Sequence, residues 1–147
     1  LYAQNAEGSL VDWVFSGTLE RFGDIKIAYA ESQVGWMPFQ LERMDSVWRE
    51  GRGGVGGGGR CPSEQVDNRV FGCIFDDLVG LRQREQVGID QILFETDSPN
   101  SDGTSPHSRT VAHSMFVEVG HDADDCYKVL RGNAIRAYGL ERFGITA

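Results

Sequence analysis

The chain is poor in the residues that build metal clusters and covalent cross-links. Its three cysteines, Cys61, Cys73 and Cys126, include no Cys-x-x-Cys pair, which argues against a structural zinc knot. It has three histidines, and no two of them are spaced four residues apart, as a pair of metal ligands on one helix would be. An odd number of cysteines and no secretion signal at Leu1 favour reduced thiols and a cytoplasmic location.

Long apolar runs, serine-nucleophile motifs and excess positive charge are also missing. No apolar run reaches the length that crosses a bilayer, so we expect no membrane segment. The Gly-x-Ser-x-Gly turn of serine hydrolases does not occur. The 147 residues carry a formal net charge of -8, and this acidic balance argues against nucleic-acid binding. Hydrophobic residues make up 40% of the chain, which is enough for one globular domain with a core.

The sequence does contain a regular alternation of helical and extended patterns. Buried strands are expected at residues 25–30, 70–75 and 91–97. Helices are expected at 10–22 after a cap at Ser9, from Pro38 onward with Phe39 on the apolar face, and at 78–87, 108–118 and 123–138. On the last helix, an apolar side is expected at Tyr127, Leu130, Ala134 and Tyr138. This alternation predicts an α/β fold with parallel strands, and three such strands with open edges look like part of a larger barrel.

The segment 51–60 is of a different composition. Seven of the nine residues from Gly51 to Gly59 are glycine, and ordering such a segment is entropically costly. We expect a mobile surface loop. A phosphate-binding loop is the alternative, but the Gly-Lys-Ser/Thr ending and the strand-loop-helix context are missing.

Asp97 is the leading candidate for chemistry because it follows a predicted buried strand. In a (β/α)8 barrel the carboxyl ends of the strands carry the catalytic groups, and a carboxylate there can bind a metal or move a proton. The alternative is an Asp that caps the turn at Ser98-Pro99. Asp76 and Asp77, after the preceding strand, are expected to cap the helix that follows them.

The loops after the first and the third predicted strand would both lie at the mouth of such a barrel. Glu31 and Gln33 could orient a substrate and Trp36 could wall an apolar pocket, while the alternatives are a solvated loop and a Trp36 packed under the next helix. Asn100 lies in the loop after Asp97 and is the fourth candidate for substrate binding. His107, in the same loop, could be a ligand or a base, or a polar residue near the next helix.

Four blocks of residues, in order along the chain, carry a resemblance to a known family. The blocks are Leu10–Gly17 with Leu19–Phe22; Ala30–Glu31 with Val34–Trp36 and Leu41–Arg43; Val70–Cys73 with Asp76–Asp77; and Phe94–Asp97 with Pro99, Ser101–Asp102 and Arg131–Ala134. Together they resemble the C-terminal part of the amidohydrolase-2 family, metal-dependent barrel enzymes related to aminocarboxymuconate-semialdehyde decarboxylase. The likeness covers nearly the whole chain apart from the glycine run.

The resemblance implies a partial (β/α)8 TIM barrel, with residues 1–147 supplying about the last three strands and their helices. Members of the family bind a divalent metal, often zinc, through a His-x-His pair on the first strand, a His on a middle strand and the Asp of the last strand. Asp97 matches that last ligand, and the histidines have no counterpart here. The sequence departs from the family at Asp97-Ser98-Pro99-Asn100, where Asp-Tyr-Pro-His is frequent, and at Ser32, where relatives have Gly.

The function implied is that of a metal-dependent hydrolase or non-oxidative decarboxylase acting on a small carboxylic or aromatic acid. One Asp cannot hold a catalytic zinc, so we expect this chain alone to be inactive or nearly so. The alternative is a non-catalytic α/β remnant, or a subunit that needs a partner chain to complete the barrel. Open strand edges would also favour a homo-oligomer.

Overall fold

The computed structural model describes residues 2–51, 59–120 and 122–146. Most of the glycine-rich segment, residues 52–58, lies outside the described residues, so its expected mobility stays a prediction. Among the described residues, no helix has the length and apolar character needed to cross a membrane.

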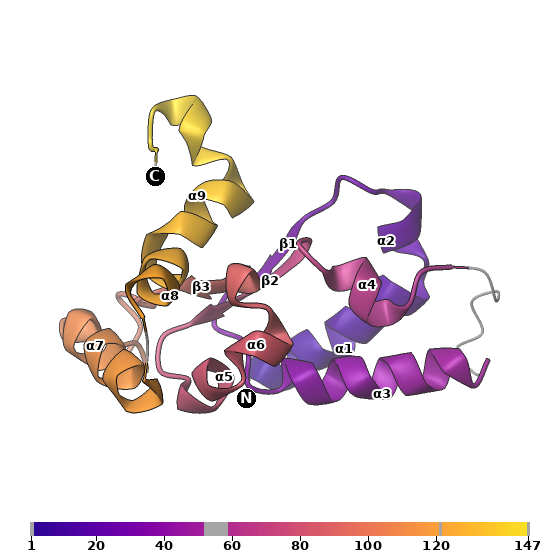
Figure 1. Ribbon diagram of the computed structural model, residues 1–147, viewed down its shortest axis with the longest axis horizontal. Coiled ribbons are helices and arrows are strands. Elements are labelled where there is room, and N and C mark those ends of the chain that lie inside the picture. Colours follow the sequence, from indigo (N-terminus) through magenta and orange to yellow (C-terminus); the bar gives the residue numbers. More distant parts are fainter. Residues whose placement is uncertain (1, 52–58, 121, 147) are drawn as a thin grey trace.

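A parallel sheet of three strands organises the chain (Figure 1). Its strands are β1 (Ile27–Tyr29), β2 (Val70–Ile74) and β3 (Ile92–Phe94), in that order across the sheet. In the register, Tyr29 is opposite Gly72, and Gly72 is opposite Ile92. The expected parallel α/β arrangement is therefore confirmed, although each strand is shorter than predicted. Because the strands are parallel, their carboxyl ends lie at one edge of the sheet.

The helices fill the intervals between the strands as the alternation predicted. The bounds are α1 (Tyr2–Phe15), α2 (Thr18–Arg21), α3 (Met37–Arg49), α4 (Pro62–Val66), α5 (Leu78–Arg82), α6 (Arg84–Val87), α7 (Ser108–Val119), α8 (Ala123–Tyr127) and α9 (Asn133–Tyr138), with short 3-10 turns at Ile89–Gln91 and Leu140–Phe143. The cap predicted at Ser9 is wrong, because α1 already begins at Tyr2. Gly17 then separates α1 from α2 by adopting a left-handed conformation with φ 73°.

Two predicted helix faces also differ from the structure. Phe39 is 68% exposed, because the buried side of α3 is formed by Met37, Leu41 and Met44. A π-helical turn, Lys128–Gly132, joins α8 to α9, and Leu130 of the predicted apolar side is exposed, while Ala134 of that side packs against the sheet. Tyr127 and Tyr138 are exposed as well, and Val129, Asn133 and Ile135 are buried instead.

The buried Asn133 gives the difference in the last helices a physical reason. Its side-chain amide donates to the carbonyl oxygens of Ile89 and Ile92, at 2.7 and 2.8 Å. These carbonyls belong to β3 and the turn before it, on the side of β3 that pairs with no strand among the described residues. The C-terminal helices thus satisfy part of the open edge of the sheet.

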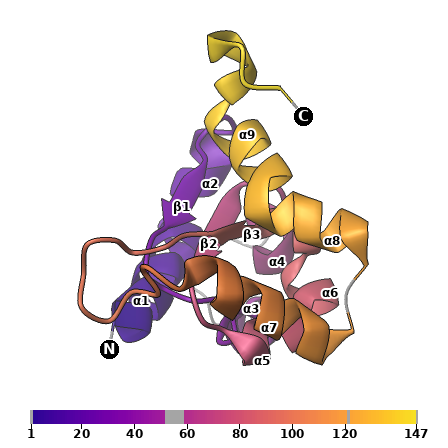
Figure 2. The same cartoon turned by 90° about the vertical axis from the view of Figure 1, so that its left-hand side faces the viewer.

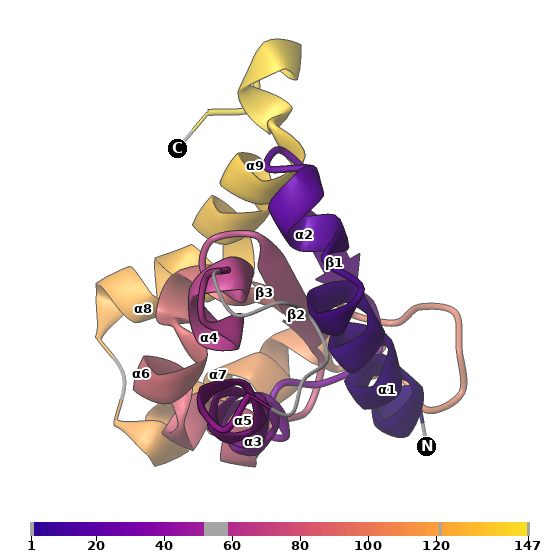
Figure 3. The ribbon, with the colours of Figure 1, turned by 90° about the vertical axis from the view of Figure 1, so that its right-hand side faces the viewer.

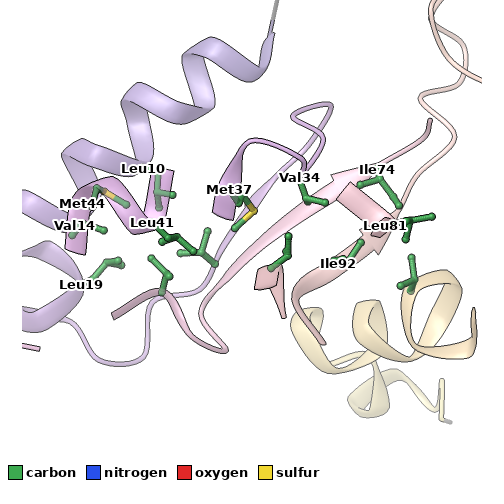
Figure 4. Close-up of a cluster of buried hydrophobic side chains, with 14 of the residues drawn as sticks. Leu10, Val14, Leu19, Val34, Met37, Leu41, Met44, Ile74, Leu81 and Ile92 are labelled. Atoms are coloured by element: carbon green, nitrogen blue, oxygen red, sulfur yellow. The ribbon is translucent and has the colours of Figure 1, made fainter. Parts of the chain in front are cut away.

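The main hydrophobic core lies between the sheet and the helices α1, α3, α5 and α7. Figure 4 shows Leu10 of α1 and Met37 of α3 gathered with Ile74 and Ile92 of the strands and with Val34 of the loop after β1. A smaller cluster of Phe71, Cys73 and Leu93 covers the opposite face of the sheet, where Ala134 and Ala137 of α9 pack against it. Figure 1 shows the corresponding placement, with α9 on the other side of the sheet from α3 and α5. All five residues of β2 are buried, as expected for a central parallel strand covered on both faces.

Arg69 ties the N-terminal helices to the sheet through backbone carbonyls. Its guanidinium donates to the carbonyl oxygens of Leu19 at 2.7 Å and Phe22 at 2.8 Å, at the end of α2. It also donates to the carbonyls of Ile25 and Gln65, each at 3.4 Å. The guanidinium of Arg69 therefore bonds to carbonyl oxygens in three places: at the end of α2, just before β1, and in α4.

Replacing Arg69 by Ala is expected to lower the free energy of unfolding by about 2–3 kcal/mol, because several carbonyl oxygens lose a charged donor. Urea unfolding followed by circular dichroism measures this. Arg43→Ala, at an exposed position of α3, is the matched control and should change stability by less than about 0.5 kcal/mol. Equal effects of the two changes would contradict this role of Arg69.

Candidate functional site

The carboxyl ends of β1 and β3 bring the predicted site residues together. Glu31 and Gln33 follow β1, and Asp97 lies three residues beyond the end of β3. The backbone N–H of Glu31 donates to Oε1 of Glu95 at 2.6 Å, which ties the loop after β1 directly to the end of β3. The parallel register therefore places Glu31, Glu95 and Asp97 at one edge of the sheet.

Asp97 is held in a turn and keeps one carboxylate oxygen free. Its backbone is left-handed, with φ 51°, and its carbonyl accepts the N–H of Asn100 at 2.8 Å. Oδ1 accepts from the side-chain amide of Asn100 at 2.7 Å. Oδ2 is buried and has no hydrogen-bond partner. The turn is thus closed by the backbone carbonyl of Asp97 and not by a side-chain cap, and the uncommitted oxygen leaves Asp97 able to bind a ligand.

The loop after Asp97 folds back onto the strand end. The N–H of Thr104 donates to the carbonyl of Thr96 at 3.1 Å. A side chain at Gly103 would collide with the carbonyl oxygens of Thr96 and Asp97, at 2.8 Å each. In Figures 2 and 3 the rest of this loop projects away from the helices before α7 begins. His107 is exposed at the start of α7, and its side chain caps no helix N–H.

The loop after β1 contains two residues in the left-handed region. Glu31 has φ 56° and Gln33 has φ 57°. The N–H of Gln33 donates to the carbonyl of Cys73 at 3.1 Å, and the side-chain Oε1 of Gln33 accepts the N–H of Phe75 at 3.4 Å. Such strained conformations persist where surrounding bonds determine them, as they do here at the end of β2.

Trp36 lies under this loop. Its indole N–H donates to the carbonyls of Ser32 at 3.0 Å and Gln33 at 3.1 Å, and its ring packs edge-on against Tyr29 with centroids 6.4 Å apart. The ring also borders the main core. The structure thus shows Trp36 packed, but against the loop and Tyr29 and not under the following helix as the alternative expected, and its role as a pocket wall stays a prediction.

The edge is strongly acidic. The pKa of Glu31 is raised chiefly by the carboxylate of Asp97, with desolvation and Asp102 adding to the rise. Burial raises the pKa of Glu95, against the lowering effect of its bond to the Glu31 N–H. Burial, with help from Glu95, raises the pKa of the Cys73 thiol to about 12, which keeps this cysteine protonated and poor as a nucleophile.

Two participants were missed or only partly anticipated from the sequence. Glu95 was not singled out, although the period of two along a strand puts it on the same side as Leu93 and Asp97. Asp77 was predicted to cap the next helix, and this is confirmed by its Oδ1, which accepts the N–H of Gly80 at 2.7 Å. Asp76 is exposed and makes no such bond.

The site can offer a metal one free ligand. The buried, unpartnered Oδ2 of Asp97 is a suitable donor for a divalent cation. Within the described residues, however, no group of three or more His, Cys, Asp or Glu side chains could hold a metal ion. A catalytic zinc takes about three protein ligands, so the described residues could supply one ligand of such a site.

Replacing Glu31 by Gln is expected to raise Tm slightly at pH 7.5, because the folded state then avoids ionising a carboxyl beside Asp97. The raised pKa means that the repulsion is present above the folded-state pKa and absent below the ordinary value of 4.5. The gain should therefore shrink as the pH falls to about 4. Thermal unfolding at both pH values measures this, with Glu42→Gln, at an exposed position of α3, as control. A gain that does not depend on pH would contradict the assigned repulsion.

The chain is similar to known proteins both in sequence and in fold. The family model described as amidohydrolase matches residues 4–140. No curated protein matches the chain. The fold is similar to the crystal structure of amidohydrolase map2389c from Mycobacterium avium subsp. paratuberculosis K-10, with a TM-score of 0.72 and 23% identity. The likeness covers 93% of this chain and 34% of that one, so the chain spans about a third of its neighbour's length. With the family match over most of its length, the chain belongs to the amidohydrolase family.

Proposed function

We propose that this chain supplies the last three strands of a metal-dependent barrel enzyme, a hydrolase or non-oxidative decarboxylase of a small carboxylic or aromatic acid. The relation to aminocarboxymuconate-semialdehyde decarboxylase is part of this proposal. The observation that carries it is Asp97, which stands at the end of β3 with one buried carboxylate oxygen uncommitted. The carboxyl ends of the strands are where barrel enzymes of this kind place their reacting groups.

Each candidate residue has a role that follows from its contacts. Asn100 holds Oδ1 of Asp97 and so leaves Oδ2 to bind the metal or to move a proton. Glu31 lies beside Asp97 and Gln33 lies at the end of β2, on a loop fixed to β2 and β3, where they would contact a substrate. A divalent metal, zinc in our proposal, would polarise a substrate carbonyl or activate water when bound.

The carboxyl of Glu31 is a second group that could carry a proton beside Asp97, whose carboxylate is the chief cause of the raised pKa of Glu31. In the protonated form it can donate a hydrogen bond to the Asp97 carboxylate, which contributes to the rise.

A second proposal concerns what completes the barrel. An apolar groove of about 450 Å³ runs beside β3. It is lined by Phe94, Thr96, Ala112, Phe116, Cys126 and Leu130, with Ser108, Arg109 and His113 also contributing. Open strand edges and apolar grooves favour association. We propose that further barrel strands cover this groove, supplied by a longer protein, by a partner chain or by a second copy. We also propose that the working enzyme is cytoplasmic and acts on a small molecule.

Metal titration tests the catalytic proposal. Calorimetry with zinc should show no tight stoichiometric binding to the isolated chain, because two or more ligands are missing. In a protein that carries the remaining strands, Asp97→Asn should weaken zinc binding by at least about 100-fold, since even the loss of outer-shell partners costs about 10–100-fold.

The exposed Asp76 provides the matched control, and Asp76→Asn should leave zinc affinity unchanged. Tight stoichiometric zinc binding by the isolated chain would show that the remaining barrel strands are not needed to form the metal site. Unchanged affinity in the Asp97 variant would remove Asp97 from the metal site.

A further inference from the structure

A single buried carboxylate joins the two loops that follow β1 and β2. Asp77 is 8% exposed, and its Oδ2 accepts the backbone N–H groups of Val34 at 2.6 Å and Gly35 at 2.9 Å. Its Oδ1 accepts the N–H of Gly80 at 2.7 Å. The first two donors belong to the loop after β1 and the third to the first turn of α5. We call these three bonds the Asp77 bracket.

Glycines make room for the bracket. A side chain at Gly80 would overlap Asp77 and Val34, and one at Gly72 in β2 would overlap Val34. At Gly35, a Cβ atom would lie 3.1 Å from Oδ1 of Asp77 and 3.3 Å from the N of Gly80. Val34 itself is fully buried. The two loops therefore approach so closely that only glycine backbone fits between them.

The bracket acts on the end of the loop that carries the candidate site. Val34 directly follows Gln33, whose side chain accepts the N–H of Phe75, and Glu31 lies two residues further back with its N–H on Glu95. Helix capping needs only the bond to Gly80. The two bonds from Val34 and Gly35 have no capping role, and they fix the loop relative to β2.

We propose that Asp77 is a positioning residue that holds Glu31 and Gln33 at the strand ends beside Asp97. That this positioning matters for catalysis rests on the proposed function. The positioning itself is a property of the chain as it stands, so it can be tested without a metal or a substrate.

Two substitutions separate positioning from capping. In Asp77→Ser the short hydroxyl can still accept from Gly80 at the helix start, but it cannot reach the loop after β1. In Asp77→Asn the side chain has one acceptor oxygen, which is expected to face the two donors of Val34 and Gly35 and to leave Gly80 without its bond. The two variants thus break different parts of the bracket.

Amide hydrogen exchange measured by NMR on the 147-residue chain gives the readout. In Asp77→Ser, exchange at Val34 and Gly35 should accelerate by at least about tenfold, and so should exchange at Glu31 and Phe75, while Gly80 stays protected. In Asp77→Asn, Gly80 should exchange faster and the other four amides should stay as in the parent chain. Acceleration at Glu31 and Phe75 is the effect that a cap alone would not produce.

Asp76→Ser, the same change at the exposed neighbouring residue, should leave all five amides within about twofold of the parent. The proposal is overturned if Asp77→Ser leaves Glu31 and Phe75 unchanged. It is also overturned if Asp77→Asn exposes those two amides while Val34 and Gly35 remain protected, and this second arm still decides if the Ser variant does not fold. The zinc titration of the Asp97 variant is independent of this hydrogen-exchange experiment. If the titration contradicts the proposed metal site, the positioning role of Asp77 is not affected.

Discussion

The pairing of β2 with a parallel strand on each side is the constraint on which the rest of the structure depends. It buries all five residues of β2 and forces the carboxyl ends of the strands to one edge of the sheet. Residues far apart in the sequence, such as Glu31 and Glu95, come into hydrogen-bonding contact only because of this register. The main core below the sheet and the smaller cluster of Phe71, Cys73 and Leu93 above it then hold the strands in place.

The edge formed in this way is costly in electrostatic terms. Glu31, Glu95 and Asp97 crowd together, and their mutual repulsion contributes to raising the pKa values of both glutamates. Natural proteins tolerate unfavourable charge and strained backbone where function uses them. The left-handed Glu31, Gln33 and Asp97 and the unpartnered Oδ2 of Asp97 occur at this same edge, and they are the observations from which the reacting site is proposed.

Much of this architecture followed from local pattern. The sequence predicted the three strands, their parallel order, the cap at Asp77 and the position of Asp97 after the third strand. It could do so because burial and turn formation depend largely on residues that are neighbours in the sequence. The errors lie where distant contacts override local preference. Ser9 lies inside α1, with its hydroxyl accepting from Tyr29, and the face of the last helices turns to bring Asn133 onto β3. Glu95 was missed because its importance depends on the loop after β1.

The sequence by itself determined the class of the fold, the segments that become strands and the acidic group at the end of the last one. Periodicity and residue type are local properties, so they can be read from the sequence without knowing which distant residues each segment contacts. The tertiary structure alone decided which groups meet. It joined Asp77 to Val34 and Gly35 across more than forty residues of sequence, and it left one oxygen of Asp97 uncommitted while the other was used by Asn100. These outcomes depend on how the loops after the strands pack against one another, which local residue spacing does not specify.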